Sequence, residues 1–438
     1  MQKHRPPHTH TPTWATLSFS FFNSIGTCVA TSTGLFFLTK HSFHFSEAAN
    51  CLLGMLVGAT YIAGALLAQR IVEWIKRRWP MAGTRDVPVG VMFAMAVLAC
   101  LPWFDSHVVQ SRSSATRSPW AVWVFAGLYS PLTGVLWPIV ESFVSGGLRG
   151  VALRKAVGQW NITWSAALVP AMLVLPQFIE GSADIALLCL APLHVVAALI
   201  AIVAIAPEPL PHDDSHPPAP ASYRGLLGAF RILLPASYFV SCVMSPMLPT
   251  LLERVGFDAK ITVIVAGLWL LTRTFTFVAL ERMSSWHGRI SHPIVGFATL
   301  VVGFGLVSIG PLLPDAVAPW ISSAGLAFFG VGMGAIYTGA IYYALAVGNS
   351  EVDAGGKHEA FIGAGYLSGP TAGLLAVLVA RGVAGKGEST VFGPYLLGAA
   401  ALVCVPVGVV VVKRLLRVAA EPSGDDGIES LENRSETA

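Results

Sequence analysis

Long runs of hydrophobic residues, separated by short polar breaks, occupy most of the chain. A helix that crosses a bilayer needs about 20 mostly apolar residues. Twelve runs of roughly that length can be drawn, and we predict a helix in each of them. The runs are residues 14–38, 46–69, 88–104, 119–143, 157–179, 183–206, 226–251, 260–280, 293–313, 318–346, 358–380 and 390–412. The third run is short, so eleven spans is the alternative count.

One long polar break divides these runs six and six. It extends from Pro207 to Arg224 and reads PEPLPHDDSHPPAPASYR, a composition typical of a flexible linker. The end of the chain is rich in Glu, Asp and Ser and has too little apolar content to pack, so we predict that it is disordered. The chain therefore divides into an N-terminal tail, a first six-helix half, a linker, a second six-helix half and a C-terminal tail, at residues 1–13, 14–206, 207–225, 226–412 and 413–438.

The positive charges are distributed unevenly over the loops. With both termini on the inside, 19 of the 27 Lys and Arg residues fall on the inner face and seven on the outer face. Loops that carry Lys and Arg stay on the cytoplasmic side of a membrane. We therefore predict a multi-pass protein of the cell membrane, with an even number of spans and with both termini and the linker in the cytoplasm.

Composition and motifs exclude most other classes of protein. Hydrophobic residues make up 54% of the chain and charged residues only 12%, against the roughly 25% usual in soluble domains. The sequence has no GxxxxGK[ST], HExxH or GxSxG motif and no paired Cys/His set. The basic residues fit membrane topology better than nucleic-acid binding. We therefore expect no enzyme activity, no cofactor, no metal site and no nucleic-acid partner.

Two local motifs add to this plan. After the second run, Leu67-Ala68-Gln69-Arg70 is followed by a basic cluster, and the eleventh run contains Gly365-Tyr-Leu-Ser-Gly369-Pro370-Thr-Ala-Gly373, a GxxxGPxxG pattern. With these motifs, the arrangement of six helices, a linker and six helices resembles the major facilitator superfamily of secondary transporters. Gln69 and Arg70 match part of the loop motif that joins helices two and three in that family, although Gln69 replaces its acidic residue.

The resemblance implies an all-α membrane protein with two pseudo-symmetric six-helix halves that bind a small molecule between them and work by alternating access. It also implies gating roles for the residues of both motifs. The glycines of the second motif predict either close packing between helices or a hinge. The resemblance further implies that helices one, four, seven and ten line a central cavity.

Polar and ionisable groups inside the hydrocarbon are energetically expensive, so each is a candidate for function. In the fourth run, Ser130, Gly134, Trp137 and Glu141 follow at steps of four, three and four and share one helix face. Trp137 either stacks on a substrate ring or packs in the core. Glu141 either couples protons and gates transport, or pairs with Arg149 or Arg154 near the cytoplasmic end of the helix.

The fifth and eighth runs combine aromatic and polar groups. Trp160 and Trp164 lie one turn apart with Asn161 beside them, a combination that suits a hydroxylated or heterocyclic solute. Asn161 has hydrogen bonding between helices as its alternative role. Arg273 is the one Lys or Arg that the count of charges places on neither face, and Trp269 precedes it by one turn. Its partner could be an anionic substrate group, Glu141 or Glu359, or an aromatic ring.

His358 and Glu359 begin the eleventh run, where they either gate and carry protons or form an ordinary acidic helix start. The remaining cavity candidates are Asn23, Tyr238, Ser241, Tyr337 and Tyr342. Taken together, the sequence predicts a monomeric secondary transporter for a small organic solute, with the proton as a candidate coupling ion. Efflux of amphipathic compounds is the first alternative, and a receptor or enzyme on the same scaffold is the second.

Overall fold

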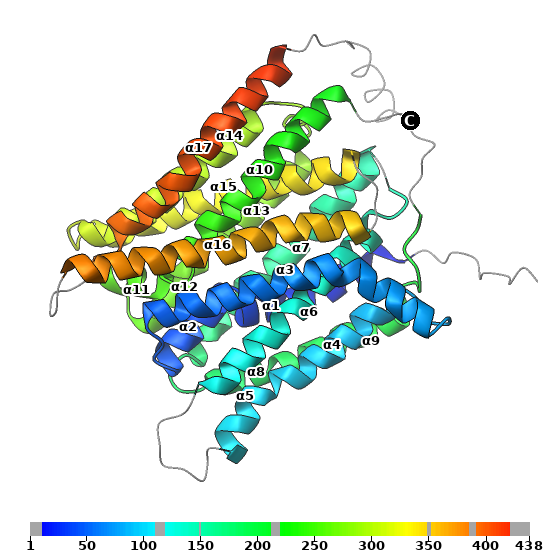
Figure 1. Cartoon of the computed structure of the whole chain (residues 1–438), viewed down its shortest axis with the longest axis horizontal. Coiled ribbons are helices and arrows are strands. Elements are labelled where there is room, and N and C mark those ends of the chain that lie inside the picture. The colour runs from blue at the N-terminus through cyan, green and yellow to red at the C-terminus, as the bar shows by residue number, and fades with distance from the viewer. Residues whose placement is uncertain are drawn as a thin grey trace, which may run out of the picture.

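The computed structural model describes residues 11–109, 119–148, 150–211, 220–347, 352–384 and 391–420, and this part of the chain consists of helices and connecting loops (Figure 1). The first half contains α1 (Thr13–Thr31), α2 (Thr33–Ser42), α3 (Glu47–Arg78), α4 (Asp86–Ala99), α5 (Leu101–Phe104), the π-helical turn η1 (Asp105–Val109), α6 (Trp120–Ser145), α7 (Gly150–Val174), η3 (Leu175–Gln177), α8 (Ala183–Leu188) and α9 (Leu190–Ala204). The second half contains α10 (Ala221–Met244), α11 (Leu248–Arg254), α12 (Ala259–Ala266), α13 (Leu268–Arg282), α14 (Ser291–Ile309), η4 (Gly310–Leu312), α15 (Ala318–Val347), α16 (Val352–Ala384) and α17 (Gly393–Ala420).

Each of the twelve predicted runs coincides with helix, and the all-helical membrane architecture is confirmed. Among the described residues, ten helical spans are long and apolar enough to cross a membrane, or eleven if the bent pair α1 and α2 is one span. The helix α7 is 25 residues long but is not among them, and its first turns carry Arg154 and Lys155. The count of twelve spans is therefore not confirmed.

Several predicted boundaries differ from the structure, among them those of the linker and of the C-terminal tail. The helix α10 begins at Ala221, within the expected linker, and α17 ends at Ala420, beyond the expected end of the last run at residue 412. A helix satisfies its own backbone hydrogen bonds, so it can continue past the apolar run into polar sequence. The rest of the predicted tails and linker, residues 1–10, 212–219 and 421–438, lies outside the described residues.

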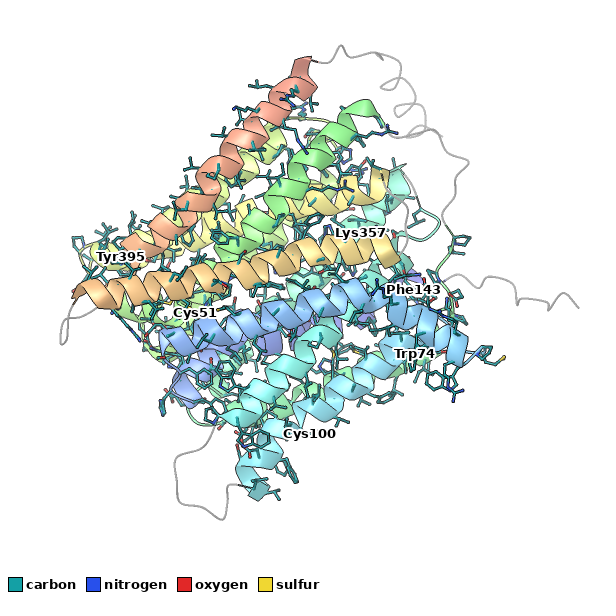
Figure 2. All side chains as sticks on the ribbon, viewed as in Figure 1. Cys51, Trp74, Cys100, Phe143, Lys357 and Tyr395 are labelled. Atoms are coloured by element: carbon teal, nitrogen blue, oxygen red, sulfur yellow. The ribbon has the colours of Figure 1, made fainter. Side chains whose placement is uncertain are left out.

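The helix ends gather on two opposite faces of the molecule. Lys76, near the end of α3, forms an ion pair of 2.7 Å with Glu208, which follows α9. The backbone N–H of Ala206 donates to the Thr11 hydroxyl, just before α1, at 3.0 Å. These contacts define what we call the linker face. In Figure 2, Trp74, Phe143 and Lys357 lie toward this end of the bundle, whereas Cys51 and Tyr395 lie toward the opposite end.

The end of α17 lies beside the start of α10, because the guanidinium of Arg414 donates to the carbonyl oxygen of Gly228 at 2.8 Å. Both described ends of the chain therefore lie near the linker. This arrangement is what an even number of spans requires. The assignment of that face to the cytoplasm stays a prediction.

The two halves meet along α3 and α16, which run side by side through the centre of the molecule (Figure 1). Gly58 of α3 faces the backbone of Tyr366 and Leu367 of α16, and a Cβ atom there would overlap both residues. Small residues let helix backbones approach closely in membranes. A second contact between the halves joins α7 to α13. The space between these two contacts holds the central cavity.

Candidate functional site

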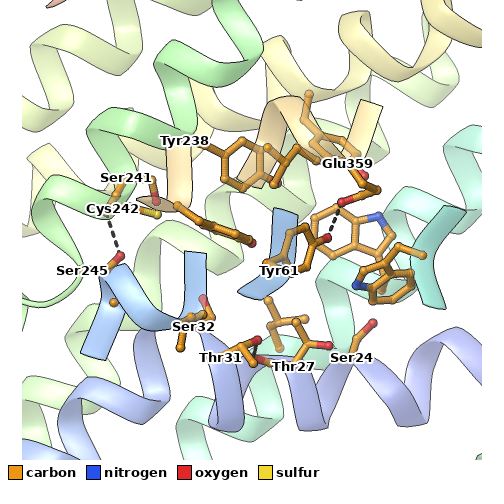
Figure 3. A pocket seen from close by; sticks show the side chains of 18 of the residues that line it. Ser24, Thr27, Thr31, Ser32, Tyr61, Tyr238, Ser241, Cys242, Ser245 and Glu359 are labelled. Carbon is orange, nitrogen blue, oxygen red and sulfur yellow. Dashed lines mark hydrogen bonds between the residues drawn. The ribbon is translucent and has the colours of Figure 1, made fainter. Parts of the chain in front are cut away.

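A buried cavity of about 80 Å³ lies between the two halves. It is lined by α1, α2, α3, α6 and α7 of the first half and by α10, α13, α15 and α16 of the second half (Figure 3). Ten of the residues singled out in the sequence line it: Trp137, Trp160, Trp164, Tyr238, Ser241, Trp269, Arg273, Tyr337, Glu359 and Pro370. They come from six helices, and both halves contribute to the same space.

Arg273 lies between two tryptophans at the wall of the cavity. Its side chain is buried, with the guanidinium carbon 4.6 Å from the ring centre of Trp164 and 4.7 Å from that of Trp269. Its Nε donates a hydrogen bond of 3.2 Å to the hydroxyl of Ser165, and its Nη2 has no hydrogen-bond partner.

Of the three partners considered for Arg273, the structure contains the aromatic one. No ion pair joins Arg273 to a carboxylate of the described part of the chain, so the expected pairing with Glu141 or Glu359 is wrong in this conformation. Trp164 belongs to α7 of the first half, whereas Trp269 lies one turn before Arg273 on α13. The arginine is therefore held by both halves.

The aromatic side chains form a continuous wall. Trp164 touches Tyr337, with ring centres 5.2 Å apart, and Trp160, with ring centres 6.4 Å apart. Trp160 donates its indole N–H to the Ser20 hydroxyl at 3.0 Å, and Trp164 donates to the side-chain oxygen of Asn161 at 3.1 Å. Asn161 therefore orients Trp164 from behind and does not line the cavity.

Glu141, His358 and Glu359 come together toward the linker face. One ligand-type atom from each lies within 4.8 Å of those of the other two, and all three side chains are buried. The hydroxyl of Tyr61 donates a hydrogen bond to Glu359 (Figure 3). Nε2 of His358 has no hydrogen-bond partner, and the carboxyl oxygens of Glu141 have none outside the cluster.

The structure bears on two sequence interpretations of these acidic residues. Glu141 does not pair with Arg154, whose guanidinium donates to the carbonyl oxygen of Glu281 at 3.3 Å, and Arg149 lies outside the described residues. Glu359 is not at a helix start, because α16 begins at Val352. The helix extends toward the linker beyond its apolar run, which places Glu359 against α3 and α6 of the other half.

Other predicted cavity residues lie elsewhere. Ser130 donates to the carbonyl oxygen of Val57 at 2.7 Å and so connects α6 to α3. Asn23 is fully buried in α1, outside the cavity lining, with no partner for its amide group. Tyr342 stacks on His287 near the linker face, with ring centres 4.7 Å apart. A helix that is buried on most sides can place a polar side chain against any of several neighbouring helices, so a polar residue in a span need not face the cavity.

The predicted gating residues divide into two groups. In the loop motif, Gln69 donates to Glu73 of the same helix at 2.9 Å, and Arg70 is exposed. In the glycine motif, a Cβ atom at Gly369 would lie 2.6 Å from the carbonyl oxygen of Phe239. Gly365 also packs tightly on α10. Pro370 lines the cavity, and Gly373 has contacts of ordinary length. Close packing is therefore confirmed at Gly365 and Gly369.

Sequence reasoning missed a row of hydroxyl groups on α1. Ser24, Thr27 and Thr31 follow at steps of three and four, which places them on one helix face, and all three line the cavity (Figure 3). Each donates its proton to a carbonyl oxygen one turn earlier, so its oxygen atom is left as an acceptor. This spacing is visible in the sequence. Tyr61 and Tyr366, also missed, carry no such signal because each is a single aromatic residue in an apolar run.

The sequence matches no protein-family profile and no curated protein. The fold, however, is similar to that of several solved transporters. A mutant of the nucleoside transporter NupG is 13% identical, with a TM-score of 0.64, and the match covers 92% of this chain and 99% of that one. The human organic anion transporter MFSD10 (TETRAN) is 13% identical, with a TM-score of 0.62 and coverage of 94% and 100%. A variant of the E. coli fucose:proton symporter FucP is 12% identical, with a TM-score of 0.57 and coverage of 92% and 98%. The chain is therefore a multi-pass membrane protein with the major facilitator fold.

Proposed function

We propose that this protein is a secondary transporter that moves a small organic anion across the membrane by alternating access. The observation that carries the proposal is the buried guanidinium of Arg273, which lines a cavity shared by both halves and lacks a carboxylate partner among the described residues. The similar solved structures are those of a nucleoside transporter, an organic anion transporter and a fucose:proton symporter. Their fold supports transport as the activity.

The charge of Arg273 requires more than its aromatic neighbours supply. Removing an ion from water costs several kcal/mol even after relaxation. A cation–π contact offsets about 0.5 to 2 kcal/mol of this desolvation cost, and the hydrogen bond to Ser165 offsets only part of what is left. A carboxylate or similar anion provides the missing partner. The planar guanidinium binds two oxygens in parallel, which also fixes the orientation of the ligand.

The rest of the cavity suits a solute with a flat or hydroxylated body. Trp164, Tyr337 and Tyr238 offer ring faces, and the α1 hydroxyl row, which lies across the cavity from Tyr238 in Figure 3, offers acceptor oxygens. Such a combination of stacking surfaces and acceptors binds ring-containing or polyhydroxylated acids. It disfavours simple aliphatic acids, which would leave both features unused.

The volume of the cavity supports alternating access. At about 80 Å³ it is smaller than the roughly 150 Å³ that holds a benzene molecule in a protein core. An organic solute therefore needs the halves to separate on at least one face before it can enter. Proton coupling through Glu141 and Glu359 stays a prediction. Uptake and efflux both stay open as the direction of transport.

A paired ligand screen tests the proposal. The purified protein is heated with carboxylic acids and with their neutral amides, and the unfolding temperature is compared. We expect acids that stabilise the protein to do so more than their amides, and Arg273→Ala to weaken this binding about 10- to 100-fold, because a hydrogen bond to a charged group contributes about 1.5 to 3 kcal/mol.

Arg289→Ala is the control, since Arg289 is exposed in a loop on the linker side of the second half. Arg273→Lys should restore only part of the affinity, because an ammonium lacks the planar fork. The protein is then reconstituted in liposomes, and the uptake of each stabilising acid is measured per folded protein molecule. A protein that prefers the amides, or an alanine variant with full binding and transport, would remove Arg273 as the anion site.

A further inference from the structure

The cluster of Glu141, His358 and Glu359 has the composition of a metal site, although the sequence predicted none. We propose that it binds one divalent transition-metal cation of the Zn²⁺ or Mn²⁺ kind, held between α6 of the first half and α16 of the second half. Two carboxylates and one imidazole are the ligands that such ions take in proteins. The cluster could not be predicted from sequence spacing, because more than 200 residues separate Glu141 from the other two.

The unpartnered atoms point into the cluster. Glu141 is 3% exposed and His358 is 7% exposed, yet Nε2 of His358 has no hydrogen-bond partner and the oxygens of Glu141 have none outside the cluster, where Glu359 is their neighbour. Buried polar atoms in proteins nearly always have a partner, and leaving one without costs about 1 to 3 kcal/mol. Carboxylate oxygens and a free imidazole nitrogen offer lone pairs. A cation at their centre would satisfy all three atoms at once.

The backbone is shaped to bring these groups together. Gly355, one turn before Glu359, faces Glu141, and a Cβ atom there would lie 2.7 Å from Oε2 of Glu141. A side chain at this position would push the two helices apart. The hydroxyl of Tyr61 donates to Glu359 from α3. Hydrogen bonds of this kind from outside the ligand set hold a metal-binding carboxylate in orientation.

The ligand atoms are close enough for a transition metal to draw them together. Zinc binds imidazole nitrogen and carboxylate oxygen at about 2.0 to 2.2 Å in a tetrahedral arrangement, so its ligand atoms lie roughly 3.4 Å apart. The ligand atoms of the cluster lie within 4.8 Å of one another. Calcium requires six to eight oxygen ligands, and magnesium prefers oxygens and water, so both are disfavoured by the imidazole. Three protein ligands leave a position free for water.

Charge balance also favours a divalent ion. No Lys or Arg of the described part forms an ion pair with Glu141 or Glu359. Two ionised carboxylates beside each other would therefore repel without a counter-charge, and a divalent cation would neutralise both. Because the ligands come from different halves, a bound metal would join the halves on the linker side. An effect of this link on transport rests on the proposed function, whereas metal binding by the cluster does not.

Metal binding is measured on the purified full-length protein in detergent, with ZnCl₂ or MnCl₂ alone. We expect about one equivalent to remain after dialysis, by mass spectrometry of the metal, and the unfolding temperature to rise with metal concentration. Glu141→Gln and His358→Gln should each weaken binding at least tenfold. The matched controls Glu281→Gln and His287→Gln remove the same groups outside the cluster and should bind like the unmodified protein.

Size-exclusion chromatography separates a folding defect from a loss of ligands. Tyr61→Phe provides a further variant that keeps all three ligands, and it should bind metal about tenfold more weakly than the unmodified protein. The proposal is overturned if neither metal binds or stabilises the unmodified protein, as expected of groups that exchange only protons, or if Glu141→Gln binds as well as the controls. None of these readouts uses transport, so a failure here is distinct from a failure of the anion-transport proposal.

Discussion

Replacing Gly369 by alanine tests how closely α16 must pack against α10. A Cβ atom at Gly369 would lie 2.6 Å from the carbonyl oxygen of Phe239 and 2.7 Å from the Cβ of Cys242, both on α10. One turn later, a Cβ atom at Gly373 would have its nearest neighbours at 3.4 Å, among them Sγ of Cys51. The two glycines share a helix and a motif and differ in free space, so they form a matched pair.

The expected cost follows from these distances. Carbon atoms in contact normally lie about 3.5 to 4.0 Å apart, so α10 must retreat by about 0.8 Å to admit a methyl group at Gly369. Backbone atoms cannot rotate away as a flexible side chain can. Overpacking of this kind costs about 1 to 3 kcal/mol. At Gly373 the methyl group fits, and alanine gains up to about 1 kcal/mol of helix propensity over glycine.

Unfolding of both variants is followed in mixed detergent micelles by tryptophan fluorescence. We expect Gly369→Ala to lose about 1 to 3 kcal/mol of unfolding free energy and Gly373→Ala to lose none. Gly369→Leu should abolish transport while some protein remains folded, because a larger side chain separates the helices further. Equal stability of the two alanine variants would refute the packing argument, and normal transport by Gly369→Leu would show that the halves move without this contact.

Three further predictions concern the faces of the molecule. On the face opposite the linker, Glu47 accepts a hydrogen bond from Thr250 at 3.0 Å and forms an ion pair with Arg381 of the other half at 2.7 Å. Glu47→Gln should therefore favour opening of that face by about 1 kcal/mol and raise the alkylation rate of the cavity residue Cys242 about fivefold. An unchanged alkylation rate would exclude a gating role for Glu47. Burial lowers the pKa of His287 to about 4, so between pH 6.5 and 4 the unfolded chain binds more protons and stability falls as the pH falls. Replacing His287 by Phe should reduce that dependence by up to one proton, and an identical pH profile would contradict it. Protease added from the cytoplasmic side should cut between Pro207 and Arg224 without separating the halves, whereas cleavage only from outside would overturn the topology.

The fold could be predicted because the membrane leaves few alternatives. Helices satisfy their backbone hydrogen bonds internally, so every long apolar run in a bilayer protein becomes a helix. The breaks within the runs were not predictable from hydropathy. The first run bends by 44° at Ser32, and the seventh is interrupted after Met244. A single serine stands at each break, which is too little to interrupt an apolar run, and Ser32 and Ser245 both line the cavity as a result.

The site was only partly predictable, because a single sequence does not say which helices are neighbours. Most of the aromatic candidates and Arg273 line the cavity, whereas Glu141 and Tyr342 do not. Their partners were not recoverable. The pairing of Arg273 with Trp164, and of Glu141 with His358, depends on contacts between halves that are far apart in the sequence. Side-chain direction was also ambiguous for Asn161, whose helix is buried on several sides.

The contacts between the halves lie at different positions along the helices, and this placement explains how they could form and break one after the other. Glu47 and Tyr61 both bind α16 but are 14 residues apart on α3, about 21 Å along the helix. A rocking movement that opens one face must break the contact there while the other can persist. Ser165 and Thr274, bonded at 2.8 Å beside Arg273, form a further contact between the halves. An anion bound to Arg273 would therefore stay in contact with both halves throughout the movement, which is what a site near the midplane of an alternating-access transporter requires.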